Sequence, residues 1–415
     1  MKNRNVLLGI DGMPFSLMEN LSTKGVMPNF KDLKSEYTFL PLKSSIPHIS
    51  SVSWSSIITG KNPGEHGIYG FTDIIPNTYS LSFPNFNALK CEPFWHTRST
   101  QQHVILNVPS TYPAKKLNGI HIAGFVALDL AKAIYPRDLL ESLERLNYQI
   151  DIDTRIAHEQ STQALFSELN RVLEIRKNTY QNLWSKLGWD NFMVVITSTD
   201  RFGHFLWNTY NDTSNAYHEV CLDFFRNVDD FIGDIYNRLE KNDTFIILSD
   251  HGMEQININV NLNTYLAQEG YLTLNNSLKK YNQITKKSKA FILDPGRIYL
   301  NKIDRYPNGS VIKSEETEII EDLKTIFKNL KFEGQKVIKE IHERDQIYHG
   351  PYLKNGPDLV LHEESGFQLK GGIGKENLFE KDDFSGMHNA DAFILINKDI
   401  DIENPSVENI IEFMV

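Results

Sequence analysis

Short runs of aliphatic residues that end abruptly at polar residues recur along the chain. They span Val6 to Ile10, Val104 to Val108, Phe192 to Ile196 and Thr244 to Leu248. Continuous apolar runs are typical of strands buried on both faces, as in a parallel sheet, whereas half-exposed strands alternate. The pattern therefore predicts four buried strands of a mainly parallel sheet.

Helical spacing lies between these runs and is clearest from Tyr217 to Leu239. Apolar residues recur there every three or four positions, which gives a helix with one apolar face that packs on the sheet. Alternation of strand and helix predicts a doubly wound α/β sandwich. Ligands of such folds bind beyond the carboxyl ends of the strands.

Two segments fit this core less well. Residues 126–190 are rich in helical pattern, and residues 256–350 mix polar loops, short strands and a helix from Glu316 to Leu330. We interpret the first as a helical insertion and the second as an insertion or cap segment that could wall the active site. The catalytic core is then expected to consist of residues 1–125, 190–255 and 350–415.

Composition indicates an ordinary globular protein with a large core. The 415 residues are 40% hydrophobic and 11% aromatic, and 43 Lys and Arg stand against 53 Asp and Glu, a net charge of -10. No basic run is present, so nucleic acid is not expected as a partner. A small phosphorylated substrate remains compatible, since a metal can supply positive charge. The oligomeric state is not indicated.

The N-terminus and the cysteines bear on location. The apolar run in MKNRNVLLGIDG is too short for a secretory signal and meets Asp11 at once. No stretch approaches the ~20 apolar residues that span a bilayer, so we expect a cytoplasmic protein without a membrane span. Cys91 and Cys221 form no disulfide framework or zinc site and are expected to be buried thiols.

Candidate chemistry follows three of the predicted strands, at Asp11, Asp200 and Asp250. A single strand-end Asp is commonly a cap or turn residue, but here histidines accompany two of them. His204 follows Asp200 by four residues, which places both on one face of a helical turn, and His251 follows Asp250 directly. Carboxylate and neutral imidazole form a ligand set suited to zinc.

Ser50 and Ser51 stand where an extended segment passes into the apolar stretch Val52 to Ile58, the expected start of a helix. Simple N-capping is one interpretation. The other is catalytic, because a helix N-terminus binds anions and a hydroxyl beside a metal can ionise and attack phosphorus.

These motifs occur in the order IDG, S-x3-W-x-S-x2-TG-x2-PG-x-HG, D-x3-H, SDHGM and a late GMH. The series resembles the type I phosphodiesterase and nucleotide pyrophosphatase family of the alkaline phosphatase superfamily, from residue 5 to about residue 398. The resemblance implies an alkaline-phosphatase-like three-layer sandwich with inserted cap segments. It also implies two zinc ions, with manganese as a possible substitute.

The resemblance further assigns site residues. It makes Ser50 the nucleophile, with Ser51 the nearest alternative, and makes His66 and Gly67 a loop that shapes the pocket. Phe71 stands where classical nucleotide pyrophosphatases have a phosphate-binding Asn, which weakens the nucleotide assignment. One implied zinc site consists of Asp200, His204 and His388, and the other of Asp11, Asp250, His251 and the Ser50 oxygen.

The function implied is hydrolysis of phosphodiester bonds, including nucleotide pyrophosphate bonds, by two-metal in-line displacement through a phosphoseryl intermediate. A phosphomonoesterase of the same superfamily and an inactive phosphate-ester-binding protein are the alternatives. Less favoured are a phosphonate or sulfate ester hydrolase, since no sulfatase-type Cys signature lies near Ser50, and a phosphosugar mutase. A monoester would need a further cation near the phosphate, and none of the nearby cations can be assigned to it: Lys43, Lys61 and Arg201. A diester would need a pocket for its second organic group, which four aromatic residues close to the motifs could line: Tyr69, Phe71, Phe205 and Trp207.

Overall fold

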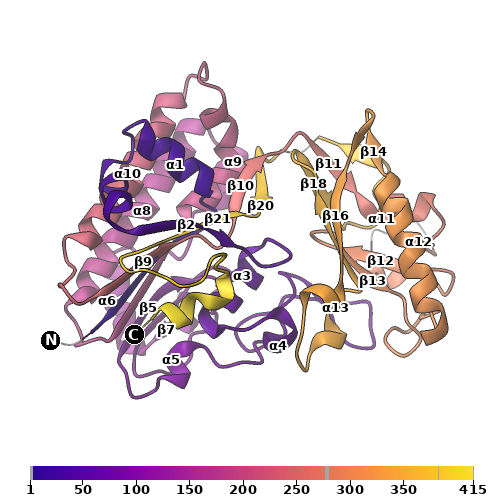
Figure 1. Cartoon of the computed structure of the whole chain (residues 1–415), viewed down its shortest axis with the longest axis horizontal. Helices are drawn as coiled ribbons and strands as arrows, with labels where there is room; N and C mark the ends of the chain where they lie inside the picture. The colour runs from indigo at the N-terminus through magenta and orange to yellow at the C-terminus, as the bar shows by residue number, and fades with distance from the viewer. Residues whose placement is uncertain (1–2, 276–279, 382, 415) are drawn as a thin grey trace. The chain divides into compact units, whose positions relative to one another are not determined.

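Eight strands form the largest sheet of the computed structural model, which describes residues 3–275, 280–381 and 383–414. Their order is β2-β21-β9-β1-β8-β5-β6-β7, and the neighbours from β9 to β6 are parallel. Figure 1 labels β2, β21, β9, β5 and β7 of this sheet. The pairs β2–β21, β21–β9 and β6–β7 are antiparallel. All four predicted strands are confirmed. The bounds are β1 Asn5–Ile10, β2 Thr38–Lys43, β5 His103–Val108, β6 Gly119–Ala123, β7 Ile134–Tyr135, β8 Asn191–Ile196, β9 Thr244–Leu248 and β21 Asp391–Ile396.

Both faces of this sheet are covered. On β1, Val6, Leu8 and Ile10 belong to one hydrophobic core and Leu7 to another, as the period of two in a strand requires. The predicted three-layer α/β sandwich is therefore confirmed. Helices contributing to the first core are α1 Phe15–Thr23, α2 Pro28–Glu36, α6 Leu140–Arg145, α8 Thr162–Trp184, α9 Ser198–Asn211 and α10 His218–Tyr236; the second core receives α3 Ser50–Thr59, α5 Phe94–Thr97 and the 3-10 helix η6 Val407–Phe413.

Contacts divide the chain into two compact units. The first unit is Met1–Lys61, Asn85–Glu254 and Phe384–Val415, and it holds the large sheet. The second unit is Asn62–Pro84 and Gln255–Asp383. Residues 126–190, including α7 Thr154–Glu159, belong to the first unit. An insertion is a segment that related proteins lack, and the division into compact units does not show which segments those are. The predicted division into core and insertions therefore stays a prediction.

The second unit is built on two small sheets. The four-stranded sheet has the order β12-β13-β17-β16, and the three-stranded sheet has the order β18-β11-β19. The predicted helix at Glu316 is present as α12 Glu316–Asn329. Other bounds are α4 Pro63–His66, α11 Leu262–Gln268, α13 Arg344–Ile347, β11 Ile258–Asn261, β12 Ala290–Leu293, β13 Arg297–Leu300, β16 Ile338–Glu343, β17 Leu359–Glu363, β18 Phe367–Lys370 and β19 Phe379–Glu380; β3 Asp73–Ile74 pairs with β4 Leu81–Ser82, and β14 Lys331–Phe332 with β15 Gln335–Lys336.

The cysteines and the helices bear on two further expectations. Cys221 is buried as expected, but Cys91 is only partly buried, so that expectation is wrong for Cys91. Among the described residues, no helix has both the length and the apolar character needed to cross a membrane. The cytoplasmic location stays a prediction.

Candidate active site

Three neighbouring strands of the large sheet deliver the predicted carboxylates. β9, β1 and β8 are adjacent and parallel, so their carboxyl ends share one edge. Asp11 follows β1, Asp250 follows β9, and Asp200 lies in the first turn of α9, just after β8. All three are buried. The predicted convergence of the three strand ends is confirmed.

The turn after β1 fits between the other two strand ends because it contains a glycine. Gly12 has φ +68°, a left-handed conformation that L side chains rarely adopt, and a Cβ there would lie 3.0 Å from Asp200 Cα. Its N–H donates to Asp250 Oδ1 at 3.3 Å. A side chain at this position would push Asp11, Asp200 and Asp250 apart.

Trp54 holds Asp11 by a hydrogen bond. Its Nε1–H donates to Asp11 Oδ2 at 3.0 Å. The indole lies directly on the strand, since a Cβ on Gly9 would be 2.3 Å from Trp54 Cη2. A buried donor to one carboxylate oxygen leaves the other, Oδ1, to face Ser50 and His251.

Asp200, His204 and His388 form the first group of candidate ligands. Because α9 is helical through both residues, the spacing of four brings His204 Nε2 within 3.5 Å of Asp200 Oδ1. His388, on β20 Gly386–Asn389, places Nε2 3.1 Å from Asp200 Oδ1 and 3.0 Å from His204 Nε2. The structure thus brings together a carboxylate and two imidazoles, of which His388 lies 188 residues from Asp200 in sequence.

Asp11, Asp250 and His251 form the second group. His251 Nε2 lies 3.6 Å from Asp11 Oδ1 and 3.3 Å from Asp250 Oδ2. The two groups adjoin, because the rings of His251 and His388 stack with centroids 3.7 Å apart. Ser50 Oγ lies at the second group, 3.3 Å from Asp11 Oδ1 and 3.0 Å from His251 Nε2.

Ser50 is the first residue of α3 and does not cap it. The N-cap is Ile49, which is extended, and no side chain caps the helix. The capping interpretation is therefore wrong, and the Ser50 hydroxyl bonds within the ligand cluster instead. Ser51 Oγ is buried, and among the described residues it has no hydrogen-bond partner.

Burial dominates the electrostatics of the cluster. It raises the pKa of Asp11, with the charges of Asp250 and Asp200 adding to the effect, and raises the pKa of Asp250 to about 8. Burial also opposes ionisation of Asp200, but His204 and a bond from His388 outweigh it and hold that pKa well below its usual range. Desolvation lowers the pKa of His204, and that of His388 to about 3.

These properties fit a site for divalent cations. Neutral imidazoles are the ligand form of histidine, and closely spaced buried carboxylates need a compensating positive charge. Asp250 Oδ2 is buried and, within the described part of the chain, has no hydrogen bond. The groups Asp11–Asp250–His251 and Asp200–His251–His388 each offer donor atoms within 4.8 Å of one another.

Backbone carbonyls orient all three imidazoles. A carbonyl only accepts, so each Nδ1 must carry the proton, and each Nε2 lone pair then faces the cluster. The acceptors are the carbonyl oxygens of Gly386 for His204 (3.1 Å), Gly252 for His251 (2.9 Å) and His48 for His388 (3.1 Å).

Arg201 braces the first group from outside. Its Nη1 donates to Asp200 Oδ2 at 3.1 Å, and Nε and Nη2 donate to Asp151 Oδ2 at 2.9 and 2.6 Å. The guanidinium also lies over the Phe125 ring, 4.2 Å from its centroid. Its charge is therefore shared by two carboxylates, which leaves little of it for a substrate phosphate.

A sequence model of the type I phosphodiesterase / nucleotide pyrophosphatase family matches residues 5–391. The chain belongs to this family. As a family member it is a phosphoric ester hydrolase, and the recognition made from its motifs is confirmed. A search of curated proteins gave no match.

Solved structures of low sequence identity share the fold of this phosphodiesterase family member. Phosphonoacetate hydrolase from Sinorhizobium meliloti has a TM-score of 0.65 at 13% identity, covering 100% of this chain and 94% of the other. The alkaline phosphatase PafA has a TM-score of 0.58 at 12% identity, covering 100% and 96%. Murine ectonucleotide pyrophosphatase/phosphodiesterase 5 has a TM-score of 0.53 at 12% identity, covering 99% and 93%.

The predicted pocket aromatics, the two lysines and the turn at His66 differ in burial and in the unit to which they belong. Tyr69 and Trp207 are buried core side chains, so the expectation that they line a pocket is wrong, while Phe205 and Phe71 are partly buried. Lys43 and Lys61 are exposed. His66, Gly67 and Phe71 lie in the second unit, where Ile68 N–H donates to His66 Nδ1 at 3.1 Å and burial lowers the pKa of His66 to about 3. That this turn shapes the substrate pocket stays a prediction.

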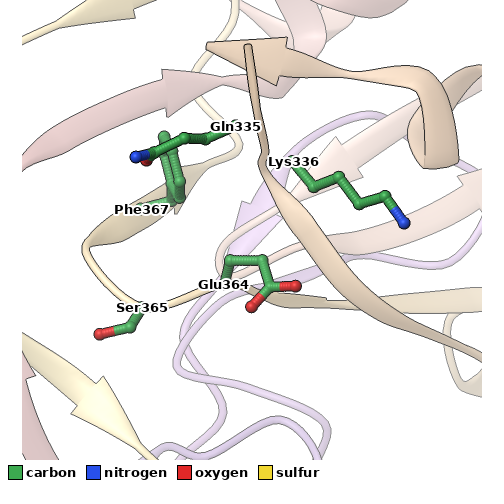
Figure 2. A pocket seen from close by; sticks show the side chains of 5 residues that line it. All are labelled: Gln335, Lys336, Glu364, Ser365 and Phe367. Atoms are coloured by element: carbon green, nitrogen blue, oxygen red, sulfur yellow. The ribbon is translucent and has the colours of Figure 1, made fainter. Parts of the chain in front are cut away.

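A pocket of about 370 Å³ in the second unit has no part in this cluster. Figure 2 shows its lining, which contains no predicted site residue: Gln335, Lys336, Glu364, Ser365 and Phe367.

Sequence reasoning missed two supports of this family site. Trp54 served only as a landmark in the serine motif, although a Trp so near a candidate nucleophile could have suggested a bond to a ligand. Asp151 carries no signal, since one Asp in the polar segment YQIDIDT resembles any turn residue.

Proposed function

We propose that this chain hydrolyses phosphodiesters with Ser50 as nucleophile and two divalent cations, zinc or else manganese, at the two ligand groups. The observation that carries the proposal is the position of Ser50 Oγ at the second group, which adjoins the first through the stacked rings of His251 and His388; it lies 3.3 Å from Asp11 Oδ1 and 3.0 Å from His251 Nε2. Bound there, the cations would lower the pKa of the hydroxyl and neutralise the phosphoryl oxygens.

The chain's own residues account for the covalent steps. Ser50 gives up its hydroxyl proton and Oγ forms a bond to phosphorus, while the ester oxygen leaves with its electron pair and takes up a proton, which gives a phosphoseryl intermediate. Water then forms a bond to phosphorus, and Ser50 Oγ leaves and regains a proton. Trp54 and Thr199 keep Asp11 in place beside Ser50, since Thr199 Oγ1 donates to the Asp11 carbonyl at 2.6 Å.

Aromatic rings beside His204 support a diester with a flat organic group. The Phe384 ring lies 5.6 Å from the His204 ring and 5.1 Å from Phe205, and His158 lies 5.5 Å from Phe205. Phe205 and Phe384 are partly buried, and His158 is exposed. Partly open rings next to a reaction centre can stack on a base or aryl group. Phe205→Ala should therefore raise KM for an aryl diester more than it lowers kcat.

The ligands of similar structures widen the choice of substrates. One structure of the Sinorhizobium meliloti hydrolase is in complex with phosphonoacetate, and one structure of murine ectonucleotide pyrophosphatase/phosphodiesterase 5 is in complex with AMP. Substrate tests should thus include a phosphonate and a nucleotide beside simple aryl esters. Turnover of monoesters alone would favour the phosphomonoesterase alternative.

Metal analysis tests the proposal directly. Protein loaded with zinc should hold about two ions per chain, lose activity when a chelator removes them and regain it when zinc returns. Asp200→Asn should reduce the metal content, and Asp304→Asn, at an exposed acid of the second unit, should not. Activity that persists without stoichiometric metal would contradict the proposal. Metal binding without turnover of any ester would indicate an inactive ester-binding protein.

A further inference from the structure

Three potential metal ligands lie on one face of a strand pair in the second unit. β16 pairs antiparallel with β17, and Glu340 lies directly opposite His362. His342 is two residues beyond Glu340, so both side chains leave the same face of β16. Directly opposed residues have Cβ atoms about 5 Å apart, and diagonal neighbours are still within reach of long side chains. The three side chains therefore form a compact triangle.

A β-bulge produces this arrangement. Ile338 pairs with Glu363 but Glu340 pairs with His362, so β16 has one more residue than β17 between these positions. Ile338 joins the hydrophobic core of the second unit. In a regular strand without a bulge, Ile338 and Glu340 would share a face because they are two residues apart, and the Glu and His side chains would turn toward that core. The bulge thus keeps Ile338 buried and directs the polar triangle to the opposite face.

The donor atoms are close to metal-binding distances. One donor atom from each of Glu340, His342 and His362 lies within 4.8 Å of the others. His342 Nε2 and Glu340 Oε2 are 3.4 Å apart, about the separation of two ligands at tetrahedral angles with zinc bonds of about 2.0–2.2 Å. The Glu340 side chain is 54% exposed and the His342 side chain 19% exposed. Glu340 can therefore rotate and bring its carboxylate to the same ion as the two imidazoles.

We propose that Glu340, His342 and His362 bind a divalent transition-metal ion, zinc in the first instance. Two imidazoles and one carboxylate suit zinc and leave a fourth position for water. β16 is the edge strand of the four-stranded sheet, and an ion that joins it to β17 would fasten that edge. The proposal does not rest on the proposed function, because it uses other residues in another unit.

A plain ion pair is the competing explanation, and His349 offers a matched control for it. His349 Nε2 lies 3.4 Å from Glu65 Oε2 in the same unit, but within the described residues no third ligand is grouped with them. A surface His–Glu pair has no reason to hold zinc against dialysis. The test therefore compares His342→Ala/His362→Ala with His349→Ala in the full chain.

Zinc per chain is measured by elemental analysis after loading and dialysis. The double variant should contain one zinc ion fewer than the wild type, and His349→Ala should contain as many as the wild type. The difference is independent of how many ions the active site holds, so failure of the proposed function would not obscure it. Activity and the melting temperature in chelator should stay at wild-type values in the double variant, whereas added zinc should raise its melting temperature less. Equal zinc content in the wild type and the double variant, or an equal loss in His349→Ala, overturns the proposal.

Discussion

Hydrogen bonds fix the acid and histidine side chains of the cluster before any substrate arrives. Each of the three imidazoles donates Nδ1–H to a backbone carbonyl, and Asp11 accepts from Trp54. Held in this way, the donor atoms lose little conformational entropy on meeting a cation. Rigid placement also matters for Ser50 in its proposed role as nucleophile, because small displacements of a reacting atom cost large factors in rate.

Replacement of Ser50 tests its proposed role as nucleophile. Ser50→Ala should lower the rate at least about 10³-fold and leave metal content largely intact, because the protein ligands remain. Ser51→Ala is the matched control, since its hydroxyl is adjacent and bonds to none of the described residues. The measurements are kcat for an aryl diester and metal per chain. An active Ser50→Ala with an inactive Ser51→Ala would move the nucleophile by one residue, and two active variants would contradict the covalent mechanism.

Asp151 is expected to act through Arg201. Asp151→Asn weakens the anchor of the guanidinium and so loosens its hold on Asp200. Removing such a support typically costs about 10- to 100-fold in metal affinity or activity. Activity should therefore fall at limiting zinc and recover at high zinc, which a general loss of stability would not produce. Asp153→Asn is the control, because Asp153 pairs with the exposed Arg155. If the activity of both variants depended on zinc concentration to the same extent, Asp151 would not support the metal site through Arg201.

At the scale of elements, the site was predictable where local pattern and topology agree. Apolar runs ending in Asp11, Asp200 and Asp250 identify strand ends, and parallel strands must end at one edge. His388 has no such signal, because it reaches the cluster on β20, far along the chain, and only the family resemblance pointed to it. The pattern also predicts the helix start at Ser50, where α3 begins, but a backbone pattern cannot distinguish a capping hydroxyl from one that bonds to candidate metal ligands.

The N-terminus of α2 is capped by a residue of another helix, which local sequence pattern does not indicate. The N-cap of α2 is Met27, which has no side-chain oxygen, and Asp229 of α10 accepts from Asn29 N–H and Phe30 N–H at 2.8 Å each. Asp229→Ala would leave two donors unpaired in a buried place, at a cost of about 2–3 kcal/mol of unfolding free energy. Denaturant unfolding measures it, with the exposed Asp230→Ala as control. Equal stability of the two variants would mean that water or another group caps α2.

For the whole molecule, long-range packing limits what the sequence reveals. The large sheet follows from its continuous apolar strands, whereas β3, β4, β14, β15 and β19 have two residues each and show no period. Residues 62–84 join the second unit through contacts such as Tyr79, whose ring stacks on Tyr306 at 5.6 Å and meets Phe291 edge-on. Partners more than 200 residues apart leave no trace in local pattern. The family resemblance compensates mainly for the first unit, because all of its motifs except PG-x-HG at residues 63–67 lie there.

The net charge of the metal-loaded site determines whether a diester or a monoester binds better in it. Two divalent cations would bring four positive charges against the three carboxylates of Asp11, Asp200 and Asp250. One net positive charge matches a diester, which carries one negative charge. A monoester carries close to two above its second pKa of about 6 and needs a further cationic group.

The cations considered from the sequence do not fill that need. Arg201 is shared between Asp151 and Asp200, and Lys43 and Lys61 are exposed. We therefore expect kcat/KM for bis-p-nitrophenyl phosphate to exceed that for p-nitrophenyl phosphate at least about tenfold, or about 1.4 kcal/mol of transition-state stabilisation. The comparison uses zinc-loaded protein at several pH values, and Lys43→Met serves as a control that should leave the ratio unchanged. A preference for the monoester at every pH would mean that another cation reaches the phosphate, because two divalent cations beside the three carboxylates leave a dianion short of one positive charge.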